Sequence, residues 1–372
     1  MISARDPLIL IKLIFKHRGI AISRFFLLLI YIVKIAFVIL FGLLEWMFFL
    51  KRIHNTEINI SPIFILGHYR SGTTYLHKLL ISDDRFGYIN YLDIYCPIST
   101  FLFEKMTRKL MQFLIKIFSI KNVFFHNMIL QPDDPSEEDL YLISSCSKYS
   151  VSWGFVFPDS VEEYFKEFTS FENQEKMKKW KQAYLYCLKK ITIRNNGKQL
   201  ILKNPPNTAR IKYLLQLFPD AKFIFLYRNP FTVYYSMQNL WKNVIEKYFS
   251  LQKISEDRRN EIIFSLYNAK MYQYEKEKNL IPKDNLVEIK YEDFERDPLK
   301  EIKRIYSNLN IPGLENSIYK LEQRIELEKK YSKFIYQYKK RTLDLIYAKW
   351  GYFIDKWNYT RPEGELKFEG QS

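Results

Sequence analysis

Four short apolar runs, separated by long stretches of helical periodicity, constrain the fold of this chain most strongly. The runs cover residues 62–66, 199–202, 222–227 and 285–289. Helical patterns such as 207–217 and 233–248 lie between them. Apolar strands joined by long crossovers form a parallel sheet with helices on both faces, and ligands bind at the carboxyl ends of its strands. The pattern therefore predicts an α/β fold around a central parallel sheet.

The first apolar run leads into a glycine-bounded loop and a helix, in FILGHYRSGTTYLHKLL. Gly67 and Gly72 allow a tight turn that leaves amide groups unpaired at the start of the helix, where the helix dipole also favours an anion. Ser71, Thr73 and Thr74 add hydroxyl donors. The segment predicts a binding site for an anionic group, with a simple tight turn as the alternative.

The order of residues in this loop differs from that of a nucleotide triphosphatase. A Walker A loop continues from its second glycine with Lys and then Ser or Thr, which hold the outer phosphates and magnesium. Here Thr73 follows the glycine, and the basic residue, Arg70, precedes it. A loop with this order fits a doubly anionic group that is bound without a metal. Separately, the three cysteines are far apart and lack paired metal-ligand spacing, so no zinc site is indicated.

A second candidate anion site lies in LYRNPFTVYYSM. Arg228 directly follows an apolar run, and Ser236 lies eight positions later (236 − 228) on the helix that begins near Pro230. A guanidinium and a hydroxyl in this arrangement can hold a second phosphate. The alternative is an arginine that caps a strand and a serine that faces solvent.

Together these motifs resemble those of a known family. GHYRSGTT resembles the 5′-phosphosulfate loop of sulfotransferases, and RNPFTVYYS resembles their 3′-phosphate motif. The segments ILKNPPNTARIKYLLQLFPDAKFIFLYR and IKYEDFERDP are similar to bacterial sulfotransferases and, more distantly, to protein-tyrosine sulfotransferases, so the resemblance covers about residues 60–300. The RKGxxGDWK element of cytosolic members is absent, and KWGYFIDKW resembles it only faintly.

The resemblance implies a P-loop, nucleotide-kinase-like fold of three layers and a 3′-phosphoadenylyl sulfate donor, with no metal required. The acceptor would be a hydroxyl, or an amine, of a small molecule, a glycan or a lipid. The residues that match the donor-binding motifs are Gly67, Arg70, Ser71, Gly72, Thr73, Thr74, Arg228 and Ser236.

Two cations match catalytic positions of the family. Arg70 occupies the place of the basic residue set against the phosphosulfate, and Lys203 resembles the lysine that tyrosine sulfotransferases use near the leaving group. Sulfuryl transfer resembles phosphoryl transfer in that the protein mainly positions groups and stabilises charge. The alternative for Lys203 is a surface lysine that closes a strand.

The general base is the hardest role to assign. PDDPSEEDLYL places Glu137 in the first turn of a helix that Ser136 is expected to cap, although the helix dipole alone also favours acidic residues there. Asp93 lies at about the distance beyond the loop where tyrosine sulfotransferases carry a glutamate. His68 and His77 flank the loop and can act near neutral pH. Glu137 is the first choice and Asp93 the second.

The N-terminal residues 1–55 form a segment distinct from the catalytic domain expected at 56–372. Residues 25–50 are long and apolar enough to cross a bilayer, but Lys34 and Glu45 interrupt them. The sequence predicts a membrane-associated helix and leaves open whether it spans the membrane, lies in its interface, or packs on a soluble core.

A second amphipathic stretch covers residues 101–118. Its apolar side chains recur at helical spacing, at Leu102, Met106, Leu110, Phe113 and Ile117. The stripe predicts contact with lipid or an apolar acceptor, or equally an ordinary core helix.

The net charge and the glycosylation triplets limit which partners and which compartment are expected. Lys and Arg exceed Asp and Glu by 57 to 41, a formal charge of +16, which favours an anionic partner. Aromatic residues do not alternate with basic ones in a strip, so no nucleic acid is expected. The alternatives to a sulfotransferase are a kinase or nucleotide triphosphatase and a non-catalytic anion- or membrane-binding protein. A cytoplasmic-facing domain is favoured over a lumenal one, although Asn59 and Asn358 lie in glycosylation triplets.

Overall fold

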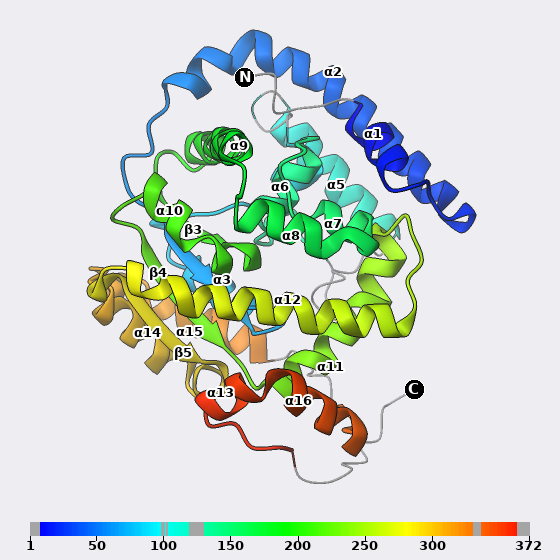
Figure 1. Cartoon of the computed structure of the whole chain (residues 1–372). Helices are drawn as coiled ribbons and strands as arrows, with labels where there is room; N and C mark the ends of the chain where they lie inside the picture. The colour runs from blue at the N-terminus through cyan, green and yellow to red at the C-terminus, as the bar shows by residue number, and fades with distance from the viewer. Residues whose placement is uncertain (1–7, 98–100, 102, 119–129, 330–335, 363–372) are drawn as a thin grey trace.

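Helices cover both faces of a central sheet and give the molecule three layers (Figure 1). The computed structural model describes residues 8–97, 101, 103–118, 130–329 and 336–362. The predicted α/β fold around a parallel sheet is confirmed.

The sheet contains five parallel strands in the order β2-β3-β1-β4-β5. They are β1 (Ile63–Leu66), β2 (Phe86–Gly87), β3 (Gln199–Lys203), β4 (Lys222–Tyr227) and β5 (Leu286–Lys290). The four predicted strands are confirmed to within one residue at each end. The sequence did not predict β2, because two residues are too few to show a periodic pattern.

Both faces of the sheet are apolar, because alternate residues of each buried strand point to opposite sides. In β1, Phe64 and Leu66 join one core, and Ile63 and Ile65 join the other. The smaller core packs against α3 (Thr73–Leu80), α14 (Pro298–Asn308) and α15 (Ile318–Lys329).

The larger core packs against most of the other helices. These are α6 (Glu138–Ser144), α7 (Trp153–Val156), α8 (Val161–Thr169), α9 (Gln174–Arg194), α10 (Ile211–Leu217), α11 (Pro230–Leu240), α12 (Glu256–Glu277) and α16 (Lys340–Lys356). The remaining α-helices of the body are α4 (Tyr91–Tyr95), α5 (Glu104–Phe118) and α13 (Tyr291–Arg296).

Two predicted helices differ from the observed ones. The 207–217 pattern begins in a 3₁₀ helix, Pro205–Ala209, and α10 starts only at Ile211. The 233–248 pattern starts earlier, at α11, and continues into a π-helix, Trp241–Phe249. The first break has a local cause, because the Thr208 hydroxyl bonds to the main chain of the glycine loop instead of facing solvent.

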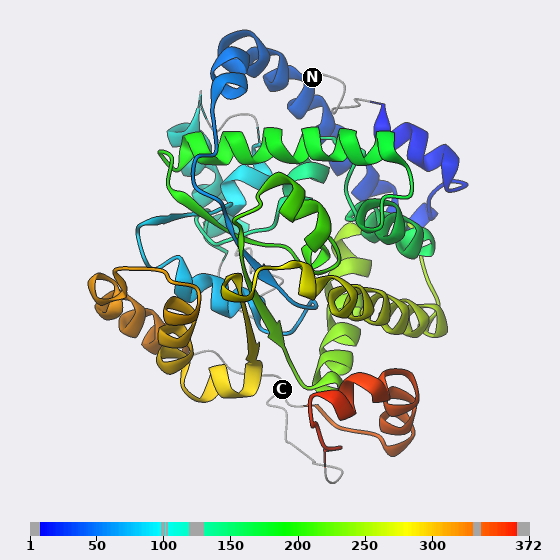
Figure 2. The same ribbon diagram turned by 60° about the vertical axis from the view of Figure 1, so that its left-hand side comes forward.

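The N-terminal segment forms α1 (Ile9–Lys16) and a 31-residue helix, α2 (Phe25–Asn55), which extends beyond the predicted 25–50 block. The stretch Ile22–Leu40, which joins the 3₁₀ helix Ile22–Arg24 to the first half of α2, is long and apolar enough to cross a membrane. Yet Val38 of α2 belongs to the larger core. Figures 1 and 2 show α2 lying along one end of the molecule above α9, away from α16.

The carboxyl ends of the three central strands meet at one edge of the sheet. Ile65 pairs with Lys203 and Leu66 with Phe225, so β1, β3 and β4 end side by side. The loop after β1, the last residue of β3 and the residue after β4 therefore converge there. This edge carries the predicted cations Arg70, Lys203 and Arg228.

Candidate active site

The loop after β1 can exist only with glycine at both of its ends. Gly67 has φ +146°, and a Cβ there would lie 2.5 Å from the Leu226 carbonyl oxygen. Gly72 has φ +91° and precedes α3, and a Cβ there would lie 2.2 Å from ring carbons of Tyr291. Thr208 fixes the loop from below: its Oγ1 accepts from Gly67 N at 2.8 Å and donates to Gly67 O at 3.1 Å. The first turn of α3 then directs its amide groups out of the sheet edge.

The two predicted anion motifs touch each other. Arg70 adopts a left-handed backbone, φ +70°, and its Nε donates to Ser236 Oγ at 2.8 Å. Arg228 Nη1 donates to the Arg70 carbonyl oxygen at 3.1 Å, and its guanidinium lies 4.2 Å from the centre of the Tyr291 ring. Ser71 and Ser236 are both buried. The residues predicted for the two ends of one nucleotide therefore form one continuous surface.

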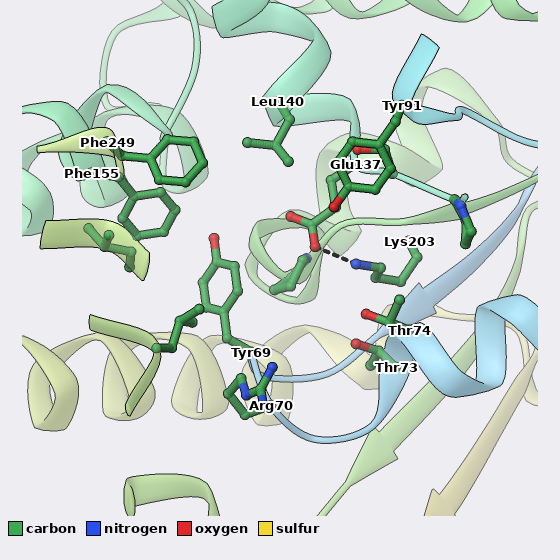
Figure 3. Close-up of a pocket in the computed structure, with 15 residues that line it drawn as sticks. Tyr69, Arg70, Thr73, Thr74, Tyr91, Glu137, Leu140, Phe155, Lys203 and Phe249 are labelled. Atoms are coloured by element: carbon green, nitrogen blue, oxygen red, sulfur yellow. Dashed lines mark hydrogen bonds and ion pairs between the residues drawn. The ribbon is translucent and has the colours of Figure 1, made fainter. Parts of the chain in front are cut away.

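A pocket opens next to this surface (Figure 3). Its polar end contains Arg70, Thr73, Thr74, Glu137 and Lys203. Figure 3 shows Phe155 and Phe249 on the opposite side of the pocket from Lys203, Thr73 and Thr74. Aliphatic side chains that also line the pocket are Leu140, Leu240 and Ile245. In Figure 3 the Tyr69 hydroxyl points into the space between the two ends.

Lys203 and Glu137 form an ion pair in the polar end of the pocket. Glu137 is the N-cap residue of α6 and has an extended backbone, so its side chain leaves the helix axis and reaches the pocket. Lys203 is 5% and Glu137 18% exposed at the side chain, so the pair is largely shielded from bulk solvent, and both residues line the pocket. The expected cap by Ser136 is not formed, and its buried hydroxyl has no hydrogen-bond partner among the described residues.

The two acidic residues that follow Glu137 point into the protein. Glu138 Oε1 accepts from Tyr184 and Asn207, and burial raises the pKa of Glu138 to about 7. Burial acts most strongly on Asp139 and would raise its pKa, but the charge of Arg210, whose Nη1 donates to it at 2.6 Å, together with hydrogen bonds from Arg210, Asn204 and Val151 N, lowers that pKa overall. These two carboxyl groups anchor α6 and leave Glu137 as the acidic side chain of this run that lines the pocket.

The second candidate base, Asp93, does not line this pocket. Its carboxylate caps α4 by accepting from Asn90 N at 3.0 Å, and it forms a 2.9 Å ion pair with Arg194. It is fully buried, and burial raises its pKa. The structure therefore gives Asp93 a capping role, because its Oδ2 accepts from the N-cap residue of α4 and pairs with Arg194.

The histidines beside the loop are both buried. Burial, with a smaller effect from the Lys203 charge, lowers the pKa of His77 to about 3, and its Nε2 lies 3.2 Å from the Ile201 carbonyl oxygen. Burial and the Lys270 charge also lower the pKa of His68 well below its usual value. Neither histidine lines the pocket, and a lowered pKa makes each ring a weak base, so the structure gives no support to a role for either near neutral pH.

The sequence did not predict the apolar end of the pocket or the side chains that pack against the Tyr69 ring. The Lys270 ammonium lies 4.0 Å from the centre of the Tyr69 ring and is fully buried. Phe155 meets the Tyr69 ring edge to face at 5.7 Å. No motif marks these residues, because an apolar wall assembled from separate helices has no fixed spacing along the chain.

Comparison with known proteins gives the family. The sulfotransferase family model matches residues 62–316, more than half of the 372-residue chain. The chain is 30% identical over 322 residues to the omega-hydroxy-beta-dihydromenaquinone-9 sulfotransferases Stf3 of Mycobacterium bovis and Mycobacterium tuberculosis, covering 86% of this chain and 81% of each relative.

Two solved structures share the fold. Sulfotransferase STF9 from Mycobacterium avium has a TM-score of 0.64 at 16% identity, covering 84% of this chain and 80% of that one. Sulfotransferase STF1 from Mycobacterium tuberculosis has a TM-score of 0.63 at 17% identity, covering 87% and 92%. The family match includes the glycine loop, the Lys203 strand and the Arg228 motif. This chain is a transferase enzyme and belongs to the sulfotransferase family.

Proposed function

We propose that this sulfotransferase moves a sulfuryl group from 3′-phosphoadenylyl sulfate to the hydroxyl of a membrane-soluble alcohol. The observation that carries the proposal is the two-ended pocket, which joins cations and hydroxyls at one end to an apolar wall at the other. A glycan or a small polar amine would find few hydrogen-bonding partners along that wall. The curated relatives, whose names state a hydroxylated menaquinone as acceptor, support the same chemical class.

Two groups of residues suit the two charged ends of the donor. The amides that follow Gly72, the guanidinium of Arg70 and the hydroxyls of Thr73 and Thr74 fit the phosphosulfate. Arg228 and Ser236 fit the 3′-phosphate, and Gly67 and Ser71 shape the loop between them. The hydrogen bond between Arg70 and Ser236 supports this assignment, because it brings the two groups within reach of a single molecule.

Glu137 suits the role of the base that takes the acceptor proton, and Lys203 suits that of the cation that stabilises the leaving oxygen. The acceptor oxygen attacks sulfur while its proton passes to a Glu137 carboxylate oxygen. The bond from sulfur to the bridging oxygen breaks, and its electron pair remains on that oxygen, which leaves as part of adenosine 3′,5′-bisphosphate. Lys203 and Arg70 stabilise the charge that develops there. The ion pair between Lys203 and Glu137 holds both side chains in the polar end of the pocket before substrates bind.

The segment of residues 1–55 is proposed to associate with a membrane, while 56–372 carry out catalysis. The apolar helix Ile22–Leu40 supports this, as does an acceptor that resides in a bilayer. A catalytic part facing the cytoplasm would meet the donor in the compartment where a bacterial enzyme finds it.

The test is transfer in vitro. The enzyme is incubated with 3′-phosphoadenylyl sulfate and either a long-chain prenyl alcohol in detergent or a short water-soluble alcohol, and products heavier by one sulfate are sought by mass spectrometry. We expect sulfation of the long-chain alcohol, without added magnesium and in the presence of a chelator. Absence of product with every acceptor would contradict the proposal that 3′-phosphoadenylyl sulfate is the donor. Sulfation of the short alcohol alone would contradict the proposal that the acceptor is a lipid. Magnesium-dependent turnover of ATP would instead support the kinase alternative.

A further inference from the structure

Three helices at one end of the molecule present apolar side chains outward. On α2 these follow one helical stripe and include Phe26, Ile30, Val33 and Leu40, with Phe26 79% and Val33 69% exposed. On α1, Leu8, Ile11 and Phe15 are exposed in the same way. Large apolar side chains exposed in this number on one helical stripe indicate a partner.

The third helix, α5, begins close to α2, because Phe101 just before it stacks on Phe49 of α2 with ring centres 5.0 Å apart. Met106, Leu110, Phe113 and Ile117 form the stripe predicted from the sequence, and all four are exposed. The fifth predicted member, Leu102, lies outside the described residues. On the inner side of α5, Ile115 packs with Tyr91, a residue that lines the pocket. We call the outward faces of α1, α2 and α5 the apolar platform.

The inner face of α2 is bound to the body of the protein along its length. Tyr31 donates to the Phe249 carbonyl oxygen at 3.0 Å, and Lys34 Nζ donates to Ser144 Oγ at 3.0 Å. Further along, the buried Glu45 carboxylate forms an ion pair with Lys190 of α9. The two residues that interrupt the apolar block are therefore both directed inward.

These contacts decide between the two membrane arrangements that the sequence left open. A helix that crossed the bilayer with residues 22–40 would have to leave the body, which would expose Val38 and place the unpaired charge of Lys34 in hydrocarbon. A helix that lies in the interface keeps every inner contact and buries only the outer stripe. The geometry favours the second arrangement.

The charges around the platform specify the kind of membrane. Between residues 8 and 55 the chain has seven Lys and Arg residues and a single acidic one, the buried Glu45. In α5, residues 104–118, four basic residues accompany one acidic residue. The exposed ones are Lys12, Lys16, Arg18, Lys51, Arg52, Lys105, Lys109 and Lys116. Basic side chains that flank an apolar face are complementary to a leaflet with anionic lipids.

We infer that the apolar platform docks on one leaflet of an anionic bilayer, with α2 lying parallel to the surface and not crossing it. This deepens the membrane association proposed above, and its consequence for the acceptor rests on the proposed function. Tyr31 of α2 holds the backbone of Phe249, and Ile115 of α5 packs on Tyr91, so the wall of the pocket lies directly behind the platform. A lipid alcohol could then reach the pocket without leaving the bilayer.

The first experiment measures vesicle binding by flotation, without donor or acceptor, so that its outcome is independent of the proposed reaction. We expect the full chain to bind vesicles of phosphatidylcholine with phosphatidylglycerol at least about tenfold more tightly than vesicles of phosphatidylcholine alone, because basic side chains near the surface are attracted to the anionic lipids. Ile30→Glu with Val33→Glu should abolish binding. Leu327→Glu, at an exposed apolar residue of α15 away from the platform, is the matched control and should bind as the unmodified chain does.

The second experiment measures the depth of spin labels at positions 26, 33 and 40 by paramagnetic relaxation, one label per variant. Cys96, which is half-buried, is replaced by Ser in this background, and the buried Cys146 and Cys187 are left in place. Similar shallow depths at all three positions would support the inference. A deepest label at 33 with shallow labels at 26 and 40 would show a spanning helix and overturn it, as would equal binding to neutral and anionic vesicles. Sulfation of a detergent-dispersed alcohol, measured on the same variants, reports separately on the proposed function.

Discussion

Arg70 Nε donates a hydrogen bond to Ser236 Oγ at 2.8 Å, although the two residues lie 166 positions apart in the chain. One comes from the loop after β1 and the other from α11, which follows β4. Because β1 and β4 are adjacent parallel strands, their carboxyl ends bring these elements together. This contact makes one site out of two motifs that could each be explained separately as an ordinary turn.

Replacement of Arg228 should weaken binding of the donor nucleotide at its 3′-phosphate end only. Arg228→Ala is expected to lower the affinity for adenosine 3′,5′-bisphosphate by about 10- to 100-fold, since a hydrogen bond to a charged group contributes about 1.5–3 kcal/mol. Binding of adenosine 5′-monophosphate, which lacks the 3′-phosphate, should change little. Calorimetry on both ligands checks this, with the exposed Arg296→Ala as the control. Unchanged affinity for the bisphosphate would contradict the assignment.

Loss of the Glu137 carboxylate should affect the chemical step. Glu137→Gln is expected to lower kcat by about 10²- to 10⁴-fold, the usual contribution of a general base. Donor affinity should stay within about threefold, because the charges that face the phosphosulfate are retained. Single-turnover kinetics and nucleotide titration measure the two effects. Asp93→Asn provides the comparison: it should lower thermal stability through the loss of its pair with Arg194 more than it lowers kcat.

Gly72 should tolerate no side chain. In Gly72→Ala a Cβ would meet the Tyr291 ring at 2.2 Å and would also force a left-handed backbone, φ +91°, on an alanine. Gly197→Ala separates the two effects, because φ is +76° there and nothing lies within 4 Å. The control should lose about 1–2 kcal/mol of stability from backbone strain. Gly72→Ala should lose more, together with nucleotide binding, as thermal melting with and without nucleotide would show.

Glu138 should make stability depend on pH. Its pKa is about 7 in the folded protein and has a usual value of 4.5, so folding takes up a proton between these values. The free energy of unfolding should therefore fall as pH rises from 4.5 to 7, by roughly 3 kcal/mol in total. Glu138→Gln, which resembles the protonated form, should remove most of this slope. Denaturant titrations at pH 5 and pH 8 test it, and an unchanged slope would mean that another group is responsible.

The apolar end of the pocket should select the acceptor. Phe155→Ala is expected to raise KM for a long-chain alcohol by about 10- to 100-fold, because a buried phenylalanine contributes about 1.5–3 kcal/mol. KM for the donor should not change. Tyr319→Ala, at an exposed aromatic residue, is the control. Because Phe155 also packs on Trp241, thermal melting must show that the variant is folded. An equal KM for both enzymes would place the acceptor elsewhere.

The sequence could predict the strands and the anion motifs because both depend on local rules. A short apolar run of a few residues is enough to predict a buried strand. Gly67 and Gly72 in turn indicate backbone angles that other residues adopt only with strain. The match of these motifs to a family then supplied the expected roles of Arg70, Lys203 and Arg228. These assignments required no knowledge of distant contacts.

The tertiary structure alone decided the protonation behaviour, the arrangement of the pocket and the orientation of α2. Glu137 faces Lys203 from 66 positions away, whereas Asp93, with a similar acidic side chain, caps a helix. His77 stays neutral because the fold buries it, and α2 has an inner face because Lys34 and Glu45 find partners in distant helices. The physical reason is the same in each case: the charge state and environment of a side chain depend on the groups that the fold brings around it, and those groups leave no pattern in the neighbouring sequence.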